Sequence, residues 1–216
     1  MSRLRIAFYG GSFDPPHLGH MAVAHGLLRQ FELDEFVFVP AFHAPHKKRA
    51  DPTSPFDRYA MLCLTTANER RISVSKIEVE QPAKPYTVET LLRLKTWLPD
   101  AQIFFVMGAD SWAQIRTWRE WESVLTLTDQ IVVTRPGFPV GVDHVTSEIR
   151  ERIIDLRGER SVSVHDHEQH VYLSDAADVD ISATKIRQMI REGDTLWTEQ
   201  VPKEVANYIE KYNIYT

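Results

Sequence analysis

Short apolar runs alternate with longer segments of helical periodicity along most of this chain. Four runs, rich in β-branched and aromatic residues, are LRIAFY (4–9), FVFVPA (36–41), IFFVMG (103–108) and QIVVTRP (130–136). The segments that place apolar residues three and four positions apart are 20–31, 56–69 and 87–98. Continuous apolar strands separated by helices are typical of a parallel sheet covered on both faces. We therefore predict a doubly wound α/β fold with a mostly parallel sheet, whose ligands bind at the carboxyl ends of the strands.

The remaining segments have weaker patterns. ISVSKIEVE (72–80) alternates and predicts a strand, and SVSVH (161–165) and VYL (171–173) predict short ones. Residues 137–160 are polar except for an amphipathic stretch, 147–156. Two helices are expected near the end: 183–193, capped by Gly193, and 202–213, with Pro202 just inside its start. Since no repeat or linker composition interrupts the chain, residues 1–216 are expected to form a single domain with a small helical part from about 180 to 216.

Composition excludes several classes of protein. The net charge of -5 argues against general nucleic-acid binding, although a few placed cations could still hold a small anion. The single cysteine, Cys63, rules out an internal disulfide framework and favours a cytoplasmic location. No apolar stretch approaches the ~18 residues that cross a bilayer, so no membrane partner is expected. A homo-oligomer is compatible with the sequence.

The stretch GGSFDPPHLGH, residues 10–20, combines a strand end with a helix start. Gly10 and Gly11 would allow a sharp turn and the close approach of a ligand, and Phe13 would anchor the loop in the core. A helix that starts near Leu18 would present free N–H groups to an anion. His17 and His20, three residues apart, would then share a face of its first turn. The alternative is a structural turn with two partly exposed histidines.

Gly10–His20 resembles the GG[ST]FDPxHxGH signature of the HxGH-type nucleotidyltransferases, which have a Rossmann-like fold. Ile181–Arg187, ISATKIR, resembles the family's second signature, ISxTxxR. The resemblance implies that the triphosphate binds between the two, with His17, His20 and Arg187 as catalytic residues. It implies a further set of ATP-binding residues: Gly10, Gly11, Ser12, Phe13, Gly19, Ile181, Ser182 and Thr184. Ser182 is also a good N-cap, and an ordinary capped amphipathic helix is the alternative for this stretch.

Three other stretches resemble the nicotinate mononucleotide adenylyltransferases. They are PAFHAPHK (40–47), the helix start PYT (85–87), and GADS (108–111) followed by TW (117–118). The resemblance implies these acceptor-binding residues: His46, Lys47, Tyr86, Thr87, Gly108, Asp110, Trp118, Arg119 and Arg135. Arg119 follows Trp118, at a position where the family commonly has an aromatic or polar residue, so the sequence departs from the family pattern here. Each stretch also has a purely structural alternative: His46 and Lys47 would be solvated loop residues, Thr87 an N-cap, Arg135 a surface arginine and Trp118 a core residue. Trp112 and Trp121 are expected in the core.

The resemblance implies transfer of AMP from ATP to nicotinate mononucleotide, with Mg²⁺ bound mainly through the ATP phosphates and few or no metal ligands from the protein. Three alternatives stay open: nicotinamide mononucleotide as acceptor, phosphopantetheine as acceptor, and a nucleotide-sensing module without turnover. HDHEQH (165–170) lies outside the resemblance. Its histidines could bind a transition metal, but we expect a polar loop.

Overall fold

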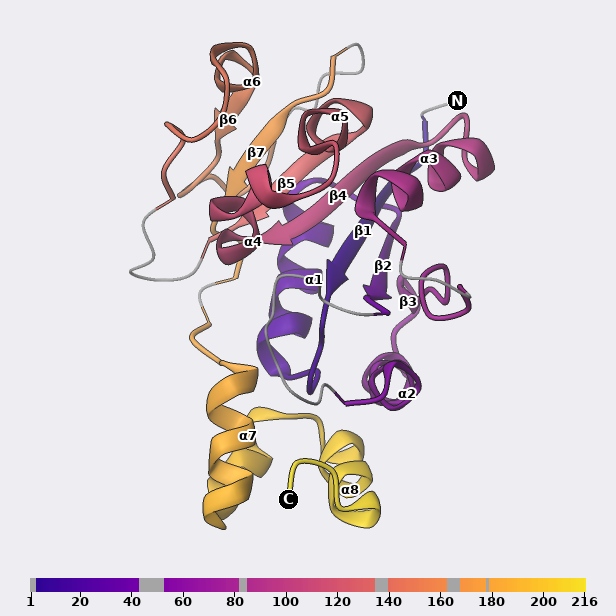
Figure 1. The fold of residues 1–216 in the computed structure, drawn as a ribbon, viewed down its shortest axis with the longest axis vertical. Coiled ribbons are helices and arrows are strands. Elements are labelled where there is room, and N and C mark those ends of the chain that lie inside the picture. Colours follow the sequence, from indigo (N-terminus) through magenta and orange to yellow (C-terminus); the bar gives the residue numbers. More distant parts are fainter. Residues whose placement is uncertain (1–2, 43–52, 82–84, 135–139, 163–167, 178) are drawn as a thin grey trace.

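A computed structural model describes residues 3–42, 53–81, 85–134, 140–162, 168–177 and 179–216. The seven strands within these residues are parallel and form one sheet in the order β3-β2-β1-β4-β5-β7-β6. They are β1 (Arg5–Gly11), β2 (Glu35–Pro40), β3 (Ile72–Val74), β4 (Gln102–Gly108), β5 (Asp129–Val133), β6 (Ile153–Asp155) and β7 (Val171–Ser174). The prediction of a doubly wound α/β fold is confirmed, and the strand order reverses between β1 and β4 (Figure 1).

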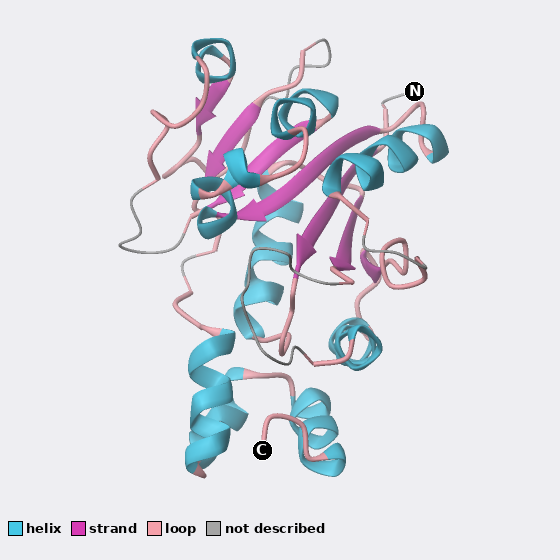
Figure 2. Ribbon diagram, in the orientation of Figure 1, coloured by secondary structure: helices cyan, strands magenta, loops and turns pink. Residues whose placement is uncertain are grey.

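Helices cover both faces of this sheet (Figure 2). The α-helices are α1 (Leu18–Gln30), α2 (Pro55–Thr66), α3 (Thr87–Trp97), α4 (Ala109–Ala113), α5 (Trp121–Leu127), α6 (Ser147–Glu151), α7 (Ala183–Glu192) and α8 (Lys203–Tyr212). Two 3-10 helices, η1 (Ile115–Thr117) and η2 (Thr195–Gln200), complete the set in the described residues. None of the described helices is both long and apolar enough to span a membrane.

The core consists of two layers, one on each side of the sheet. Along β1, Ile6 and Phe8 pack with α3 and α5 on one face, while Ala7 and Tyr9 pack with α1 on the other. Both faces of the strand are therefore buried, which explains its uninterrupted apolar run. A third cluster joins α7, η2 and α8 to Met61 of α2. Figure 1 shows these C-terminal helices beyond the carboxyl ends of β1 and β2.

The predicted strand over 72–80 is wrong beyond Val74. The Ser75 amide donates to the Phe38 carbonyl at 2.8 Å, and the chain then leaves the sheet. The Ile77 amide turns back to the Ser75 hydroxyl (3.2 Å), and the Glu80 amide bonds to the Lys76 carbonyl (3.1 Å). The alternating apolar residues are buried in this turn instead of in a strand.

The other local predictions need smaller corrections. The stretch 147–156 divides into the short helix α6 and the edge strand β6. Residues 161–162 form no strand, and the rest of SVSVH lies outside the described residues, as does the first half of HDHEQH, residues 165–167. Pro202 occupies the N-cap of α8, one position before its first turn. Gly193 caps α7 as predicted, with φ of +73°.

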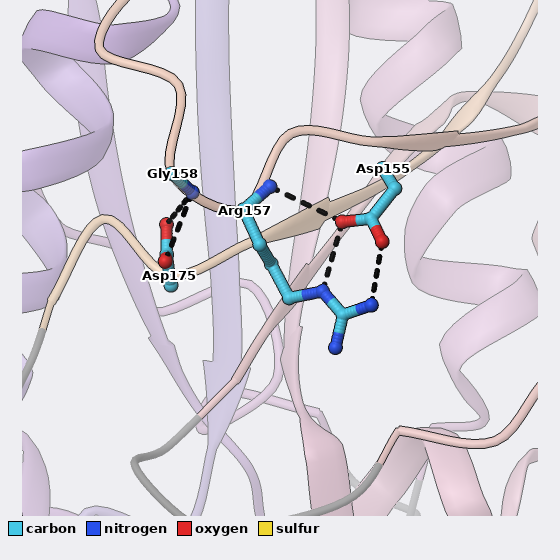
Figure 3. A network of polar contacts seen from close by, with 4 residues as sticks. All are labelled: Asp155, Arg157, Gly158 and Asp175. Atoms are coloured by element: carbon cyan, nitrogen blue, oxygen red, sulfur yellow. Dashed lines mark hydrogen bonds and ion pairs between the residues drawn. The ribbon is translucent and has the colours of Figure 1, made fainter.

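A polar network fixes the turn that follows the edge strand β6 (Figure 3). Arg157 donates to both carboxylate oxygens of Asp155, from Nε at 2.8 Å and from Nη2 at 2.5 Å, and this lowers the pKa of Asp155. The Gly158 amide donates to the Asp175 carboxylate at 3.0–3.1 Å. Asp175 directly follows β7, so the network attaches this turn to the start of the connection that leads to α7.

Candidate functional site

The opening loop turns at Phe13, two residues after the glycines. β1 continues through Gly11, which pairs with Pro40 of β2, so the prediction of a turn at Gly10–Gly11 is wrong. Phe13 has φ of +49°, a conformation uncommon for residues other than glycine. The peptide bond between Asp14 and Pro15 is cis. Its ring packs edge-on against Tyr9 (5.3 Å between centroids) and Phe38 (5.2 Å). The prediction that Phe13 anchors the loop in the core is thus confirmed.

The two histidines stack on each other at the N-terminus of α1. Their ring centroids are 3.6 Å apart, with 24° between the planes. His17 is the N-cap, and its backbone N–H donates to Nδ1 of His20 at 3.1 Å. Because a backbone amide can only donate, Nδ1 accepts and the proton of a neutral His20 lies on Nε2. This arrangement can present an imidazole N–H to an anion at a helix N-terminus.

The second signature lies directly against the first. Arg187 of α7 is buried and donates from Nη1 to the Asp14 carbonyl at 2.6 Å and from Nη2 to the Thr184 hydroxyl at 3.0 Å. A Cβ on Gly19 would lie 3.5 Å from Cβ of Ile181. Two motifs more than 160 residues apart therefore meet at the carboxyl end of β1. Ser182 occupies the N-cap of α7 as predicted, without a side-chain capping bond.

Tyr215, at the C-terminus, is a contact of the opening loop that sequence reasoning missed. Its hydroxyl donates to Oδ1 of buried Asp14 at 2.7 Å. Burial raises the pKa of the Tyr215 hydroxyl, and the neighbouring Asp14 charge raises it further. The loop is therefore fixed both at the Asp14 backbone, through Arg187, and at its side chain. No local pattern marks Tyr215, because its partner is 201 residues away.

Arg58, on the first turn of α2, was also missed. It is only 3% exposed and donates to three segments: to the Ser12 carbonyl, to the Ala41 and Phe42 carbonyls, and to the Thr53 carbonyl. One sequence signal could have found it. Arg58 precedes Met61 and Leu62 by three and four residues, so it lies on the buried face of a helix, where an arginine is rare unless it is paired.

The described acceptor residues of the prediction lie at the start of α3 and in the stretch that begins with the last residue of β4. Gly108 is the N-cap of α4, and Oδ1 of Asp110, in the first turn, would lie 2.8 Å from a Cβ on Gly108. Trp118 is partly buried and packs edge-on against Phe105 of β4, with 6.4 Å between the centroids. Trp112 is in the core as predicted, whereas Trp121 is only partly buried against it.

The start of α3 brings two predicted residues together. Tyr86, not Thr87, is its N-cap, and the Glu89 carboxylate accepts from the Tyr86 amide at 3.1 Å. The Arg119 guanidinium lies over the Tyr86 ring, 4.7 Å from its centroid, and also 3.9 Å from the Glu89 carboxylate. Arg119 thus brings a positive charge close to this helix N-terminus. The predicted residues His46, Lys47 and Arg135 lie outside the described residues.

Glu78 is an ionisable group close to Arg58 and to Thr90 of α3. Burial raises its pKa to about 7, although hydrogen bonds from Thr90 and from the Phe42 backbone and the charge of Arg58 act in the opposite direction. The Thr90 hydroxyl donates to Oε1 of Glu78 at 2.9 Å. Glu78 therefore connects α3 to the segment that follows β2. Within the described residues, no three His, Cys, Asp or Glu side chains gather as a metal site.

The raised pKa of Glu78 predicts a pH-dependent stability. The folded state keeps a proton up to about pH 7, while the unfolded chain releases it near 4.5, so the free energy of unfolding falls as pH rises between these values. Over this pH range the free energy of unfolding is expected to fall by about 3 kcal/mol in total. We expect the melting temperature of the parent to fall several degrees more from pH 5 to pH 8 than that of Glu78→Gln, whose side chain does not titrate. Identical pH profiles of melting would contradict this prediction.

The sequence of this chain is similar to a family model and to known proteins. The cytidylyltransferase-like family model matches residues 8–189. The chain is 36% identical to a probable nicotinate-nucleotide adenylyltransferase of Corynebacterium glutamicum, over 99% of this chain and 89% of that protein. It is 32% identical to a protein of the same name from Desulfatibacillum aliphaticivorans, over 98% of this chain and 100% of that protein.

A solved structure shares the fold. It is Plasmodium falciparum nicotinic acid mononucleotide adenylyltransferase complexed with NaAD, with a TM-score of 0.74 and 20% sequence identity, over 99% of this chain and 98% of that one. A second structure of the same protein, complexed with APC, has a TM-score of 0.71.

Proposed function

The chain belongs to the cytidylyltransferase-like family, and from this membership we propose that it is a nucleotidyltransferase that transfers AMP from ATP to nicotinate mononucleotide, giving deamido-NAD and pyrophosphate. Relatives 32–36% identical over nearly the whole chain are named for this activity. The observation that carries the proposal is the contact between the two phosphate-binding signatures, where Arg187 reaches the loop that leads to His17 and to His20 in the first turn of α1.

The triphosphate binds between α1 and α7 in this proposal. The N-terminus of α1 and the two imidazoles hold it from one side, with Nε2–H of His20 nearest the α-phosphate. Arg187, Thr184 and Ser182 hold the departing pyrophosphate from the other. The remaining residues that line the nucleotide are Gly10, Gly11, Ser12, Phe13, Gly19 and Ile181.

No protein nucleophile or general base takes part, because the acceptor's 5′-phosphate already carries a nucleophilic oxygen. That oxygen attacks the α-phosphorus, the bond to the β-phosphate bridge oxygen breaks, and pyrophosphate leaves with the electron pair. The protein contributes alignment of the two phosphates and stabilisation of charge on the phosphoryl group in transfer.

The acceptor binds between α3 and the segment that follows β4. The N-terminus of α3, at Tyr86 and Thr87, holds the nicotinate carboxylate, and the nearby charge of Arg119 favours it. Trp118 packs against the pyridine ring, while Gly108 and Asp110 contact the ribose. His46, Lys47 and Arg135 complete the proposal as ligands of the acceptor phosphate.

The donor groups here suit phosphate better than a divalent cation. The described side chains facing the proposed triphosphate are imidazoles, hydroxyls and a guanidinium, and Asp14 is buried under Tyr215. Mg²⁺ binds oxygen ligands and often takes them from substrate phosphates. We therefore propose Mg²⁺ held through the ATP phosphates, where it would neutralise charge on the leaving group. We also propose a single domain over residues 1–216, working in the cytoplasm.

The proposal is tested by measuring pyrophosphate release from ATP with each candidate acceptor. Nicotinate mononucleotide is expected to exceed nicotinamide mononucleotide by roughly 10–100-fold in kcat/KM, because a hydrogen bond to a charged group contributes about 1.5–3 kcal/mol. Phosphopantetheine should give no release above background. Preference for another acceptor would change the substrate assignment, and ATP binding without release for any acceptor would favour a sensing module.

A further inference from the structure

Arg58 is more deeply buried than its position on the surface helix α2 requires. Its exposed fraction is 3%, whereas Phe56, two residues earlier, is 63% exposed. Burial lowers the pKa of Arg58, and the charges of Asp14, Tyr215 and Glu78 oppose that effect. A buried guanidinium is costly unless its charge and its N–H groups are compensated. The hydrogen bonds of Arg58 are therefore the reason that it can occupy this place.

Each nitrogen of the guanidinium reaches a different segment of the chain. Nη1 donates to the Ser12 carbonyl at 2.7 Å, in the loop that follows β1. Nη2 donates to the Ala41 carbonyl at 2.6 Å, directly after β2, and Nε donates to the Thr53 carbonyl at 3.1 Å, just before the N-cap of α2. One side chain thus joins the opening loop to both described ends of the connection between β2 and α2.

These segments belong to different halves of the proposed site. The opening loop leads to the imidazoles assigned to ATP, and the connection between β2 and α2 contains His46 and Lys47, assigned to the acceptor. Transfer requires that the acceptor oxygen and the α-phosphorus approach in line, and a misplacement of about 1 Å, even from a change far from the chemistry, can cost 10²-fold in rate. The distance between the two loops therefore matters directly for the reaction.

We propose that Arg58 is a positioning residue that sets the ATP-binding loop against the acceptor-binding segment. The inference rests on the proposed function. Arg58 contacts neither substrate; it acts through the backbone of Ser12 and Ala41. Its loss is expected to lower kcat more than it raises the KM of either substrate, because each half-site keeps its own ligands while their alignment is lost.

The test compares Arg58→Lys with the parent at a temperature where both are folded. Lysine keeps the positive charge, but its single nitrogen cannot bond to carbonyls of all three segments. We expect kcat to fall at least ~10-fold while the KM values for ATP and for nicotinate mononucleotide stay within ~3-fold. Arg58→Gln, which removes the charge but keeps an N–H donor, is the second variant and should behave alike.

Arg152→Lys is the matched control. Arg152 also donates from its guanidinium to a backbone carbonyl, that of Gln169, but it lies before the edge strand β6. The control should lose stability without losing kcat. A parent-like kcat in Arg58→Lys, a rise in the KM of one substrate alone, or failure of both Arg58 variants to fold would each overturn the proposal. Since the parent is assayed in parallel, absence of turnover in the parent would instead refute the proposed function.

Discussion

Replacing His20 with alanine is expected to lower the rate of pyrophosphate release by about 10²–10³, the loss typical when a preorganised donor to a developing anion is removed. His20 Nδ1 accepts from the His17 amide, which orients the ring and places its proton on Nε2. The ring is also held by stacking on His17 and by edge-on packing against Phe13, at 4.9 Å between centroids. Such a donor needs little reorganisation when charge develops on the phosphate.

The fold should survive this change. His20→Ala removes a capping interaction worth about 1 kcal/mol, so the melting temperature should fall by only a few degrees. His25→Ala, on the same helix, is the control: His25 is paired with Glu69 at 3.0 Å and is not assigned to any ligand. The measurement is steady-state pyrophosphate release with both substrates saturating. Parent-like turnover in His20→Ala, or an equal loss in His25→Ala, would refute the assignment.

Replacing Gly26 with alanine is expected to destabilise the protein, although alanine is normally the better helix former. A Cβ at this position of α1 would lie 2.2 Å from the Ala176 carbonyl oxygen and 2.9 Å from its carbon. Both atoms belong to backbone, so α1 or the connection from β7 to α7 must move. Overpacking of this kind typically lowers the free energy of unfolding by 1–3 kcal/mol. Replacing glycine by alanine inside a helix raises it by at most ~1 kcal/mol, so the net effect is destabilising.

The consequence should extend to activity, because the displaced connection leads to Ile181 and Arg187. We expect a melting temperature lower by roughly 2–8 °C, and a reduced affinity for ATP in the fraction that remains folded. Gly141→Ala is the control, since nothing lies within 4 Å of a Cβ there. Thermal melting and ATP titration of the two variants measure both effects. A Gly26→Ala protein as stable as the parent would show that the connection adapts freely.

Much of the sheet could be predicted because β1, β2, β4 and β5 are buried on both faces. Such strands need uninterrupted apolar residues, and those runs are visible in the sequence. The same reasoning failed at 75–80, where alternation indicated a half-buried strand. Alternation records which side chains are buried, not whether the backbone pairs with a neighbour; here hydrogen bonds to Ser75 and Lys76 turn the chain away.

Some residues of the candidate site could be predicted from local spacing in the sequence, and others could not. His17 and His20, and Thr184 and Arg187, are three apart on helices that the sequence marks clearly, so each pair could be placed on one helix face. Arg58, Glu78 and Tyr215 have no such local mark. Tyr215 bonds to a carboxylate 201 residues away, and Glu78 bonds to the Thr90 hydroxyl of α3. Arg58 bonds to backbone carbonyls, which every residue possesses.

The sequence by itself therefore determined the parts: a parallel sheet, a helix start that bears two imidazoles, and a second helix that bears a hydroxyl and a guanidinium. Only the tertiary structure decided that Arg187 rests on the Asp14 carbonyl, that Tyr215 covers the Asp14 carboxylate, and that Arg58 joins two loops. The physical reason is that local periodicity depends on neighbours within a few residues. Contacts between distant segments depend instead on how all the intervening elements pack, and no short pattern contains that information.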